Sequence, residues 1–413
     1  MHILMFKVKS VCYDSTFYLA DLYGRMLETF GHQVTYFNSD DEPITALDRY
    51  TGMHFDAMLD FNSLLPNLDT DEGKLFLDTI DAPFYNYILD HPLYHNKQLK
   101  APLSRYHVIC LDTEHAEYIR RYYPHIRSVH VLPLCGLPFL SGTESYQVSK
   151  LFGNSALEQL DDTQNNIDEI SKKYDLIFTG TYSDPNMLYQ RIKGFDEPLS
   201  GQMQHMIEIM LAEPALNQEQ ALLRMLTEEQ IPVSKISVPE HLYAFFMVDM
   251  YVKSYYREQV LNQVLSTGRT LCLYGGMWDV WQTGYASQLD IHEMVPFKDS
   301  PRVLAGAWIS LNVMPWFKAG IHDRVLTAMR SGTVSLTDDS RMLDQYFAKG
   351  EDLLVYDLTE LDRIPEMVEY YLEHKNALRD MATQGRLKAD AQHSEIVRVH
   401  VLEQIFRADT QED

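Results

Sequence analysis

The fold is indicated most clearly by residues 2–37, which read HILMFKVKSVCYDSTFYLADLYGRMLETFGHQVTYF. Residues 2–8 form an apolar strand, and apolar side chains then recur at helical spacing from Leu19 to Phe30. Gly31 stands where a glycine commonly ends a helix, and residues 34–37 form a second strand. Strand, helix and strand within this length predict a βαβ unit and therefore a parallel sheet.

The same alternation continues through the first third of the chain. Asp112 or Thr113 is expected to cap a further helix, because a short polar side chain there precedes apolar residues at helical spacing. More strands are expected at residues 55–61, 84–89, 106–111 and 128–134. Residues 1–140 are therefore predicted to form one doubly wound α/β domain.

The composition becomes polar and acidic after this domain, so residues 141–173 are expected to be a linker. A second α/β domain is predicted at residues 174–390, with strands at residues 174–180, 269–274, 308–313, 333–337 and 353–356. It is interrupted by a helical insertion at about residues 186–267. Residues 391–413 are expected to form a C-terminal helix with an acidic tail.

The predicted insertion carries many aromatic side chains at helical spacing. We interpret them as core, because most large aromatic side chains are buried in folded domains. A sugar-stacking surface or a homodimer contact through the insertion stays open. The residues concerned are Tyr243, Phe245, Phe246, Tyr251, Tyr255 and Tyr256.

Charge and composition exclude several classes of protein. Among 413 residues, 59 are acidic and 35 are basic, which gives a formal net charge of -24. Such a surface repels polyanions, so no nucleic acid partner is expected. No apolar run approaches the ~20 residues of a membrane span, and no leader peptide is recognised. With only widely spaced cysteines, the sequence predicts a cytoplasmic protein without an integral membrane segment.

Several common motifs are absent from the sequence. No G-x-G-x-x-G follows the first strand and no P-loop is present, which argues against a dinucleotide dehydrogenase or a P-loop kinase. His91 and His95 are four residues apart, but Pro92 separates them. The adjacent Asp338 and Asp339 follow a strand, where such a pair usually opens the next helix. The sequence therefore predicts no metal site and no cofactor.

The densest chemical signal lies in residues 308–347, where strand, loop and helix follow one another twice. Arg324 falls in the first turn of the helix that begins near His322, with Lys318 and Gly320 just upstream. A glycine, cations and free N–H groups at a helix N-terminus beyond a strand's carboxyl end are typical of a small-anion site. A surface ion pair of Arg324 with Asp323 or with a neighbouring acid is equally compatible with this pattern.

This segment resembles the donor-binding half of GT-B glycosyltransferases, in particular the group-1-like family that includes spore-maturation-type glycosyltransferases. The resemblance rests on Gly320, Arg324, Ser331-Gly332, Thr337, Asp338-Asp339 and the series Phe347, Gly350, Glu351 and Asp352. It extends to Gly180-Thr181, Gly275-x-x-Trp278, Val295-Pro296-Phe297 and Asp90-His91-Pro92. It implies an α/β fold in which two Rossmann-like, doubly wound domains face a cleft.

The resemblance also implies residue roles. The family usually has a glutamate that binds the ribose at the position of Thr327, so the pocket of this chain is expected to differ there. Catalytic roles are expected for His91 and Arg324. Donor-binding roles are expected for Gly180, Thr181, Gly275, Trp278, Pro296, Phe297, Lys318, Gly320, His322, Asp323, Arg324 and Thr327.

The implied activity is transfer of a hexosyl group from a nucleotide-diphosphate sugar, with a UDP-sugar favoured, to a saccharide, protein or small-molecule acceptor. Metal-independent transfer is expected, and retention is favoured over inversion, for which His91 would be the base. Two alternatives stay open: a nucleotide-sugar epimerase or phosphorylase of the same fold, and a non-catalytic glycosyltransferase-like scaffold.

Overall fold

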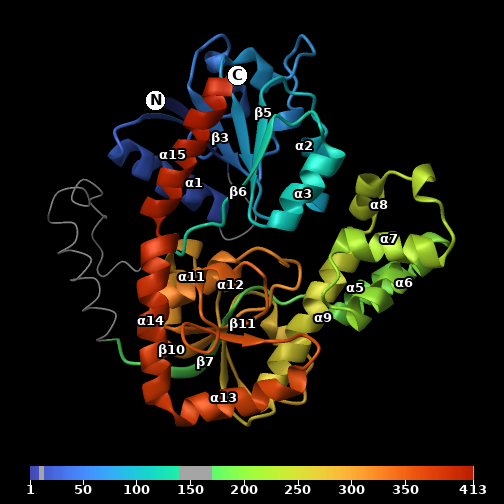
Figure 1. The fold of residues 1–413 in the computed structure, drawn as a ribbon, viewed down its shortest axis with the longest axis vertical. Coiled ribbons are helices and arrows are strands. Elements are labelled where there is room, and N and C mark those ends of the chain that lie inside the picture. The colour runs from blue at the N-terminus through green and yellow to red at the C-terminus, as the bar shows by residue number, and fades with distance from the viewer. Residues whose placement is uncertain (9–13, 139–169, 413) are drawn as a thin grey trace. The chain divides into compact units, whose positions relative to one another are not determined.

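The computed structural model describes residues 1–8, 14–138 and 170–412, and its contacts divide the chain into two units (Figure 1). The first unit comprises residues 1–169, 296–301 and 390–413, and the second comprises residues 170–295 and 302–389. Residues 141–169 of the predicted linker lie outside the described residues. In the described part of the chain, no helix is both long enough and apolar enough to cross a membrane.

The first unit contains a parallel sheet with the strand order β2-β1-β3-β4-β5-β6. β1 and β2 pair in parallel and α1 connects them along the chain, which confirms the predicted βαβ unit. The side chain of Asp112 accepts the Glu114 N–H at 2.7 Å and caps α3, as predicted. The elements are β1 (His2–Lys7), α1 (Ser15–Thr29), β2 (Gln33–Asn38), β3 (Ala57–Phe61), β4 (Phe84–Tyr87), α2 (Asn96–Leu99), β5 (Tyr106–Cys110), α3 (Thr113–Tyr122) and β6 (Ser128–Val131).

The last helix of the chain, α15 (Glu395–Glu412), belongs to the first unit. Its Asp409 carboxylate lies 2.9 Å from both Ser128 Oγ and His130 Nε2. Burial opposes ionisation of this carboxyl, but hydrogen bonds with His107, His130 and Ser128 outweigh it and hold the pKa of Asp409 well below its usual range. An ionised carboxylate therefore anchors the C-terminal helix to the sheet edge.

The second unit contains a parallel sheet with the strand order β12-β11-β10-β7-β8-β9. The predicted strands are present, and β9 (Leu289–His292) is an edge strand that the sequence analysis missed. The other elements are β7 (Tyr174–Thr179), β8 (Leu271–Tyr274), α10 (Ser300–Ala305), β10 (Ala307–Leu311), α11 (Asp323–Arg330), β11 (Val334–Asp338), α12 (Leu343–Tyr346), β12 (Leu354–Tyr356), α13 (Ile364–Glu373) and α14 (Lys375–His393).

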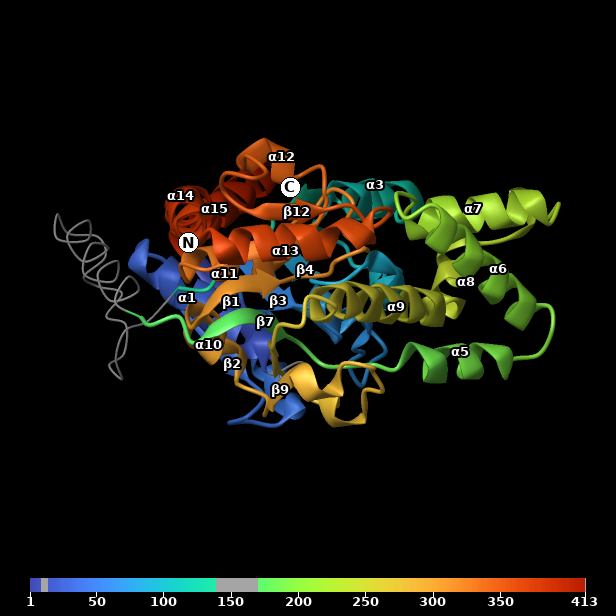
Figure 2. The same ribbon diagram turned by 90° about the horizontal axis from the view of Figure 1, so that it is seen from below.

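The insertion of the second unit is helical, as predicted. Figure 2 shows α5 to α7 extending away from the sheet of this unit, while α9 runs back towards α13, which it contacts. The core interpretation of its aromatic residues is confirmed for Phe245 and Tyr256, but it is wrong for Phe246, which is 39% exposed at the start of α9. The helices are α5 (Pro185–Lys193), α6 (Leu199–Ala212), α7 (Gln218–Glu228), α8 (Val238–Ala244) and α9 (Phe246–Leu265).

Candidate functional site

The candidate site of the second unit lies where β7, β8 and β10 end. Because these neighbouring strands are parallel, their carboxyl ends meet at one edge of the sheet, where ligands usually bind in such folds. Gly180 directly follows β7, Gly275 directly follows β8 and Asn312 directly follows β10. The sequence analysis selected the two glycines but not the asparagine.

The turns after β7 and β8 pass each other at very short distance. The Gly180 N–H donates to the Tyr274 carbonyl at 2.8 Å, and the Tyr182 N–H donates to the Gly276 carbonyl at 3.0 Å. Gly275 has φ 146°, and a Cβ at this position would lie 2.1 Å from the Gly180 carbonyl oxygen. Only a residue without a side chain fits between the two turns.

Trp278 holds the first of these turns. Its indole Nε1 donates to the Gly180 carbonyl at 2.7 Å, and the side chain is 1% exposed. The rings of Phe178, Tyr182 and Trp281 surround it at centroid distances of 5.4–5.6 Å. The structure thus places Trp278 as a buried support of the turn, and a direct contact of Trp278 with a nucleotide sugar stays a prediction.

Arg324 points towards this turn. As predicted, α11 begins at His322–Asp323: His322 is its N-cap, and Nδ1 of His322 accepts the Arg324 N–H at 3.1 Å. The guanidinium donates to Asn312 Oδ1 at 2.9 Å and lies 5.5 Å from the centre of the Phe178 ring. A Cβ added at Gly180 would lie 3.6 Å from Nη2 of Arg324, so the guanidinium is next to this turn. The sequence analysis left open an ion pair between Arg324 and Asp323. The Asp323 carboxylate lies 2.9 Å from Nδ1 of His322.

A second arginine, Arg257 of α9, reaches the same turn. Its guanidinium donates to the Thr181 carbonyl and lies 5.4 Å from the centre of the Phe178 ring. The two guanidinium groups of Arg257 and Arg324 therefore share one aromatic ring beside Gly180 and Thr181. The sequence analysis missed Arg257, because it lies in the insertion, more than 70 residues from the turn. Two positive charges at one turn of an acidic chain suit a small anion.

The loop before α11 is tied to its neighbours. Lys318 Nζ donates to the Pro214 carbonyl, which lies between α6 and α7 of the insertion. The Lys318 carbonyl accepts the Arg341 N–H at 3.0 Å, and the Gly320 carbonyl accepts the Ser340 hydroxyl at 2.7 Å. Thr327 lies on α11 and is 2% exposed. Binding of a nucleotide sugar by Lys318, Gly320 and Thr327 stays a prediction.

The remaining predicted site residues belong to the first unit. Pro296 and Phe297 group with it by their contacts, and the Phe297 ring lies 6.1 Å from that of Tyr18 on α1. His91 follows β4 and is 3% exposed. Its Nδ1 accepts the Leu93 N–H at 3.1 Å, so a neutral His91 ring carries its proton on Nε2.

Asp338, at the end of β11, is a buried acid next to the candidate site. Its Oδ1 accepts the Met314 N–H at 2.7 Å. Burial raises the pKa of the Asp338 carboxyl to about 7, although the Met314 N–H and the charge of Lys318 oppose the shift. The neighbouring Asp339 is half exposed and pairs with Lys349 at 2.7 Å. The two carboxylates therefore have separate partners.

Asp338→Asn is expected to flatten the pH dependence of stability. Between the ordinary pKa of 3.8 and the raised value of about 7, the folded chain binds this proton more tightly than the unfolded chain, so stability falls as the pH rises through that window. Asparagine stays neutral, so the variant should melt at a higher temperature than the wild type above neutrality and not near pH 3.8. Thermal denaturation across this range tests it, with Asp339→Asn as the control; equal slopes for wild type and Asp338→Asn would contradict it.

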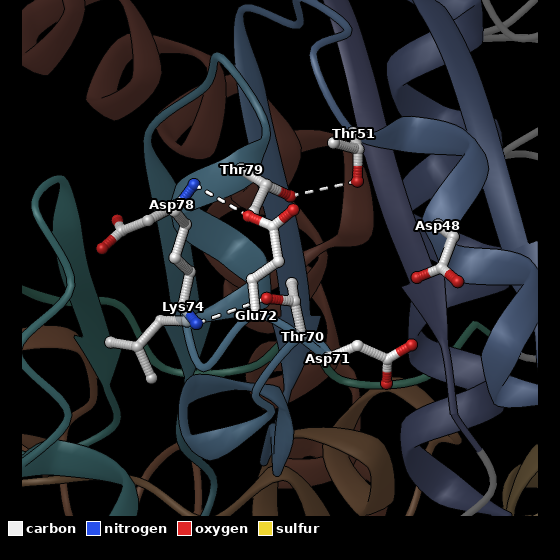
Figure 3. A pocket seen from close by; sticks show the side chains of 9 residues that line it. Asp48, Thr51, Thr70, Asp71, Glu72, Lys74, Asp78 and Thr79 are labelled. Carbon is white, nitrogen blue, oxygen red and sulfur yellow. Dashed lines mark hydrogen bonds and ion pairs between the residues drawn. The ribbon is translucent and has the colours of Figure 1, made fainter.

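A separate cavity in the first unit is acidic. It has a volume of about 660 Å³, and Figure 3 shows the Lys74–Glu72 ion pair at 3.1 Å and the Thr51–Thr79 hydrogen bond at 3.3 Å in its wall. Acidic side chains outnumber the single lysine, so the cavity does not suit a phosphate. Its lining residues are Asp48, Thr51, Thr70, Asp71, Glu72, Lys74, Leu75, Asp78 and Thr79.

A known protein family matches one part of the chain in sequence. Residues 257–404, which begin at Arg257 and include Gly275 and Arg324, match the family model described as glycosyl transferase-like. No curated protein matches the chain in sequence.

Solved structures give the fold. HepE of Anabaena in complex with UDP is similar at a TM-score of 0.52 and 9% identity, over 99% of this chain and 100% of that one. Sucrose-phosphate synthase from Thermosynechococcus elongatus is similar at a TM-score of 0.52 and 12% identity, over 100% of both chains. The chain also spans 57% of the length of TarM, at a TM-score of 0.45 and 6% identity.

Proposed function

We propose that this protein transfers a hexosyl group from a UDP-sugar to an acceptor hydroxyl. The chain has the GT-B fold of glycosyltransferases, and one segment of it is glycosyl transferase-like in sequence. The observation that carries the proposal is the pair of guanidinium groups, Arg257 and Arg324, which both lie over the Phe178 ring beside the Gly180–Thr181 turn. HepE, which is similar in fold, has been solved with UDP and with UDP-glucose, and this supports a UDP-sugar as the donor.

The two guanidinium groups would act on the leaving group. In the transfer step the acceptor oxygen forms a bond to the anomeric carbon, while the bond from that carbon to the β-phosphate oxygen breaks and its electron pair stays on the diphosphate. Fixed cations beside the developing charge lower the barrier, because they need no reorganisation when the charge appears. Such cations also make a divalent metal at the diphosphate unnecessary, so adding Mg²⁺ or Mn²⁺ should not raise turnover.

The transfer step also releases the proton of the acceptor hydroxyl, and a group must accept it. A neutral His91 carries its proton on Nε2, so this nitrogen donates rather than accepts. His91 is therefore better suited to bind a substrate oxygen than to act as the base of an inverting reaction. We infer that the acceptor proton passes to the departing phosphate on the same face of the sugar, which gives retention.

The test is a binding screen of the full chain against UDP-, GDP-, TDP- and CMP-sugars by thermal shift, followed by incubation with each ligand that binds. We expect stabilisation by a UDP-sugar and its slow hydrolysis without an acceptor. A new isomer of the nucleotide sugar would instead identify an epimerase. Absence of binding to every nucleotide sugar would overturn the proposal and favour a non-catalytic scaffold.

A further inference from the structure

Two neighbouring strands of the second unit bring together a thiol, a carboxylate and an imidazole. β8 and β9 pair in parallel, with Cys272 opposite Asp290 and Tyr274 opposite His292. Residues two apart on a strand point to the same face, so these four side chains share one face of the sheet at its β9 edge. Cys272 and Asp290 are 18 residues apart in sequence, so the three residues do not match a short metal-binding sequence motif.

The potential ligand atoms of Cys272, Asp290 and His292 all lie within 4.8 Å of one another. The Asp290 Oδ2 and His292 Nε2 atoms are 3.0 Å apart. Across residues 1–8, 14–138 and 170–412, no other group of three or more His, Cys, Asp or Glu residues meets this condition. Cys272 is 1% exposed, whereas Asp290 and His292 are partly exposed. The carboxylate and the imidazole are thus the solvent-facing members of this group.

The imidazole of His292 is held in place by two aromatic rings. Its ring stacks on Tyr274 with a centroid distance of 4.5 Å and an interplanar angle of 10°, and it meets the Tyr174 ring edge-on at 6.0 Å. Its Nε2 is shielded from solvent and lies 3.0 Å from Asp290 Oδ2, but it forms no well-oriented hydrogen bond to any residue that the structure describes. A buried polar atom without a hydrogen bond is costly, and a metal ion is one way to satisfy it.

We propose that Cys272, Asp290 and His292 bind one Zn²⁺ ion, with water as a fourth ligand. Sulfur, nitrogen and oxygen ligands from Cys, His and Asp are those that zinc takes in proteins, commonly in four-coordinate sites. The thiol gives up its proton to solvent as the ion binds. The ion would join the edge strand β9 to β8 beside the Gly275 turn. It does not depend on the proposed transferase activity, because none of the three ligands belongs to the Arg257–Arg324 site.

The test uses the full chain after dialysis against a chelator. Zinc is titrated in competition with a chromophoric chelator, and Co²⁺ is added separately as a spectroscopic probe. The wild type should bind one equivalent of zinc and should show the thiolate-to-cobalt charge-transfer band. Cys272→Ala should lose that band, and His292→Ala should bind zinc at least about tenfold more weakly.

The controls match each variant. Cys110→Ala removes a buried strand thiol from the first unit, and His54→Ala removes a histidine that lies 2.8 Å from an aspartate, Asp81. Both should bind zinc like the wild type. If Cys272→Ala fails to fold, as judged by circular dichroism, His292→Ala decides the outcome. No stoichiometric zinc binding by the wild type, or equal binding by His292→Ala, would overturn the proposal.

Discussion

Arg324→Ala is expected to weaken binding of a UDP-sugar or to lower turnover by at least about tenfold, which corresponds to ~1.4 kcal/mol. The guanidinium lies beside the Gly180 turn, held by Asn312 and Phe178, and this is the turn at which we propose that the diphosphate binds. Loss of a fixed charge beside a developing anion removes stabilisation that water does not replace. Calorimetry with UDP and single-turnover kinetics measure the two effects separately.

Arg379→Ala is the matched control for this variant. Arg379 also lies over an aromatic ring, Trp308, at 5.3 Å, and it also donates to an asparagine Oδ1, that of Asn376, at 3.0 Å. It is not part of the candidate site, so its loss should leave binding unchanged. Arg257→Ala should behave like Arg324→Ala, because both groups lie at one turn. Unchanged binding and turnover in Arg324→Ala would remove this residue from the site.

Gly275→Ala is expected to lower the free energy of unfolding by at least about 2 kcal/mol, because strained backbone alone costs of order 1–3 kcal/mol per residue. The added Cβ would lie 2.1 Å from the Gly180 carbonyl oxygen and 2.6 Å from its carbon. The atom that must move is backbone and not the end of a flexible side chain. The two turns must therefore separate, which also displaces Gly180 from Arg324.

Thermal denaturation measures this effect, and roughly 2–4 °C is expected for each kcal/mol in a domain of ~150–250 residues. Gly284→Ala is the matched control: a Cβ at Gly284 would meet nothing within 4 Å, so its melting temperature should stay at the wild-type value. Equal melting temperatures for Gly275→Ala and Gly284→Ala would show that the two turns do not require close backbone contact.

Local pattern predicted most of the strands because each buried strand of a parallel sheet is a short apolar run bounded by turn residues. β1, β3 and β7 are of this kind, and Asp112 and His322 mark the starts of α3 and α11 by capping them. The edge strand β9 escaped because its sequence, Leu289-Asp-Ile-His292, is short and alternates with polar residues. β9 is defined by its pairing with β8, and this pairing cannot be recognised from the local sequence.

The sequence by itself determined the α/β class, the helical insertion and the segment around Arg324, because these depend on periodicity and on capping within a few residues. The tertiary structure alone decided that Arg257 joins Arg324 across Phe178, that Gly275 must accommodate the Gly180 carbonyl, and that Cys272, Asp290 and His292 meet. The physical reason is distance along the chain: these contacts join residues that are 12 or more positions apart, except within the Asp290–His292 pair. Strand order and helix packing bring such residues together, and no local preference of the backbone records them.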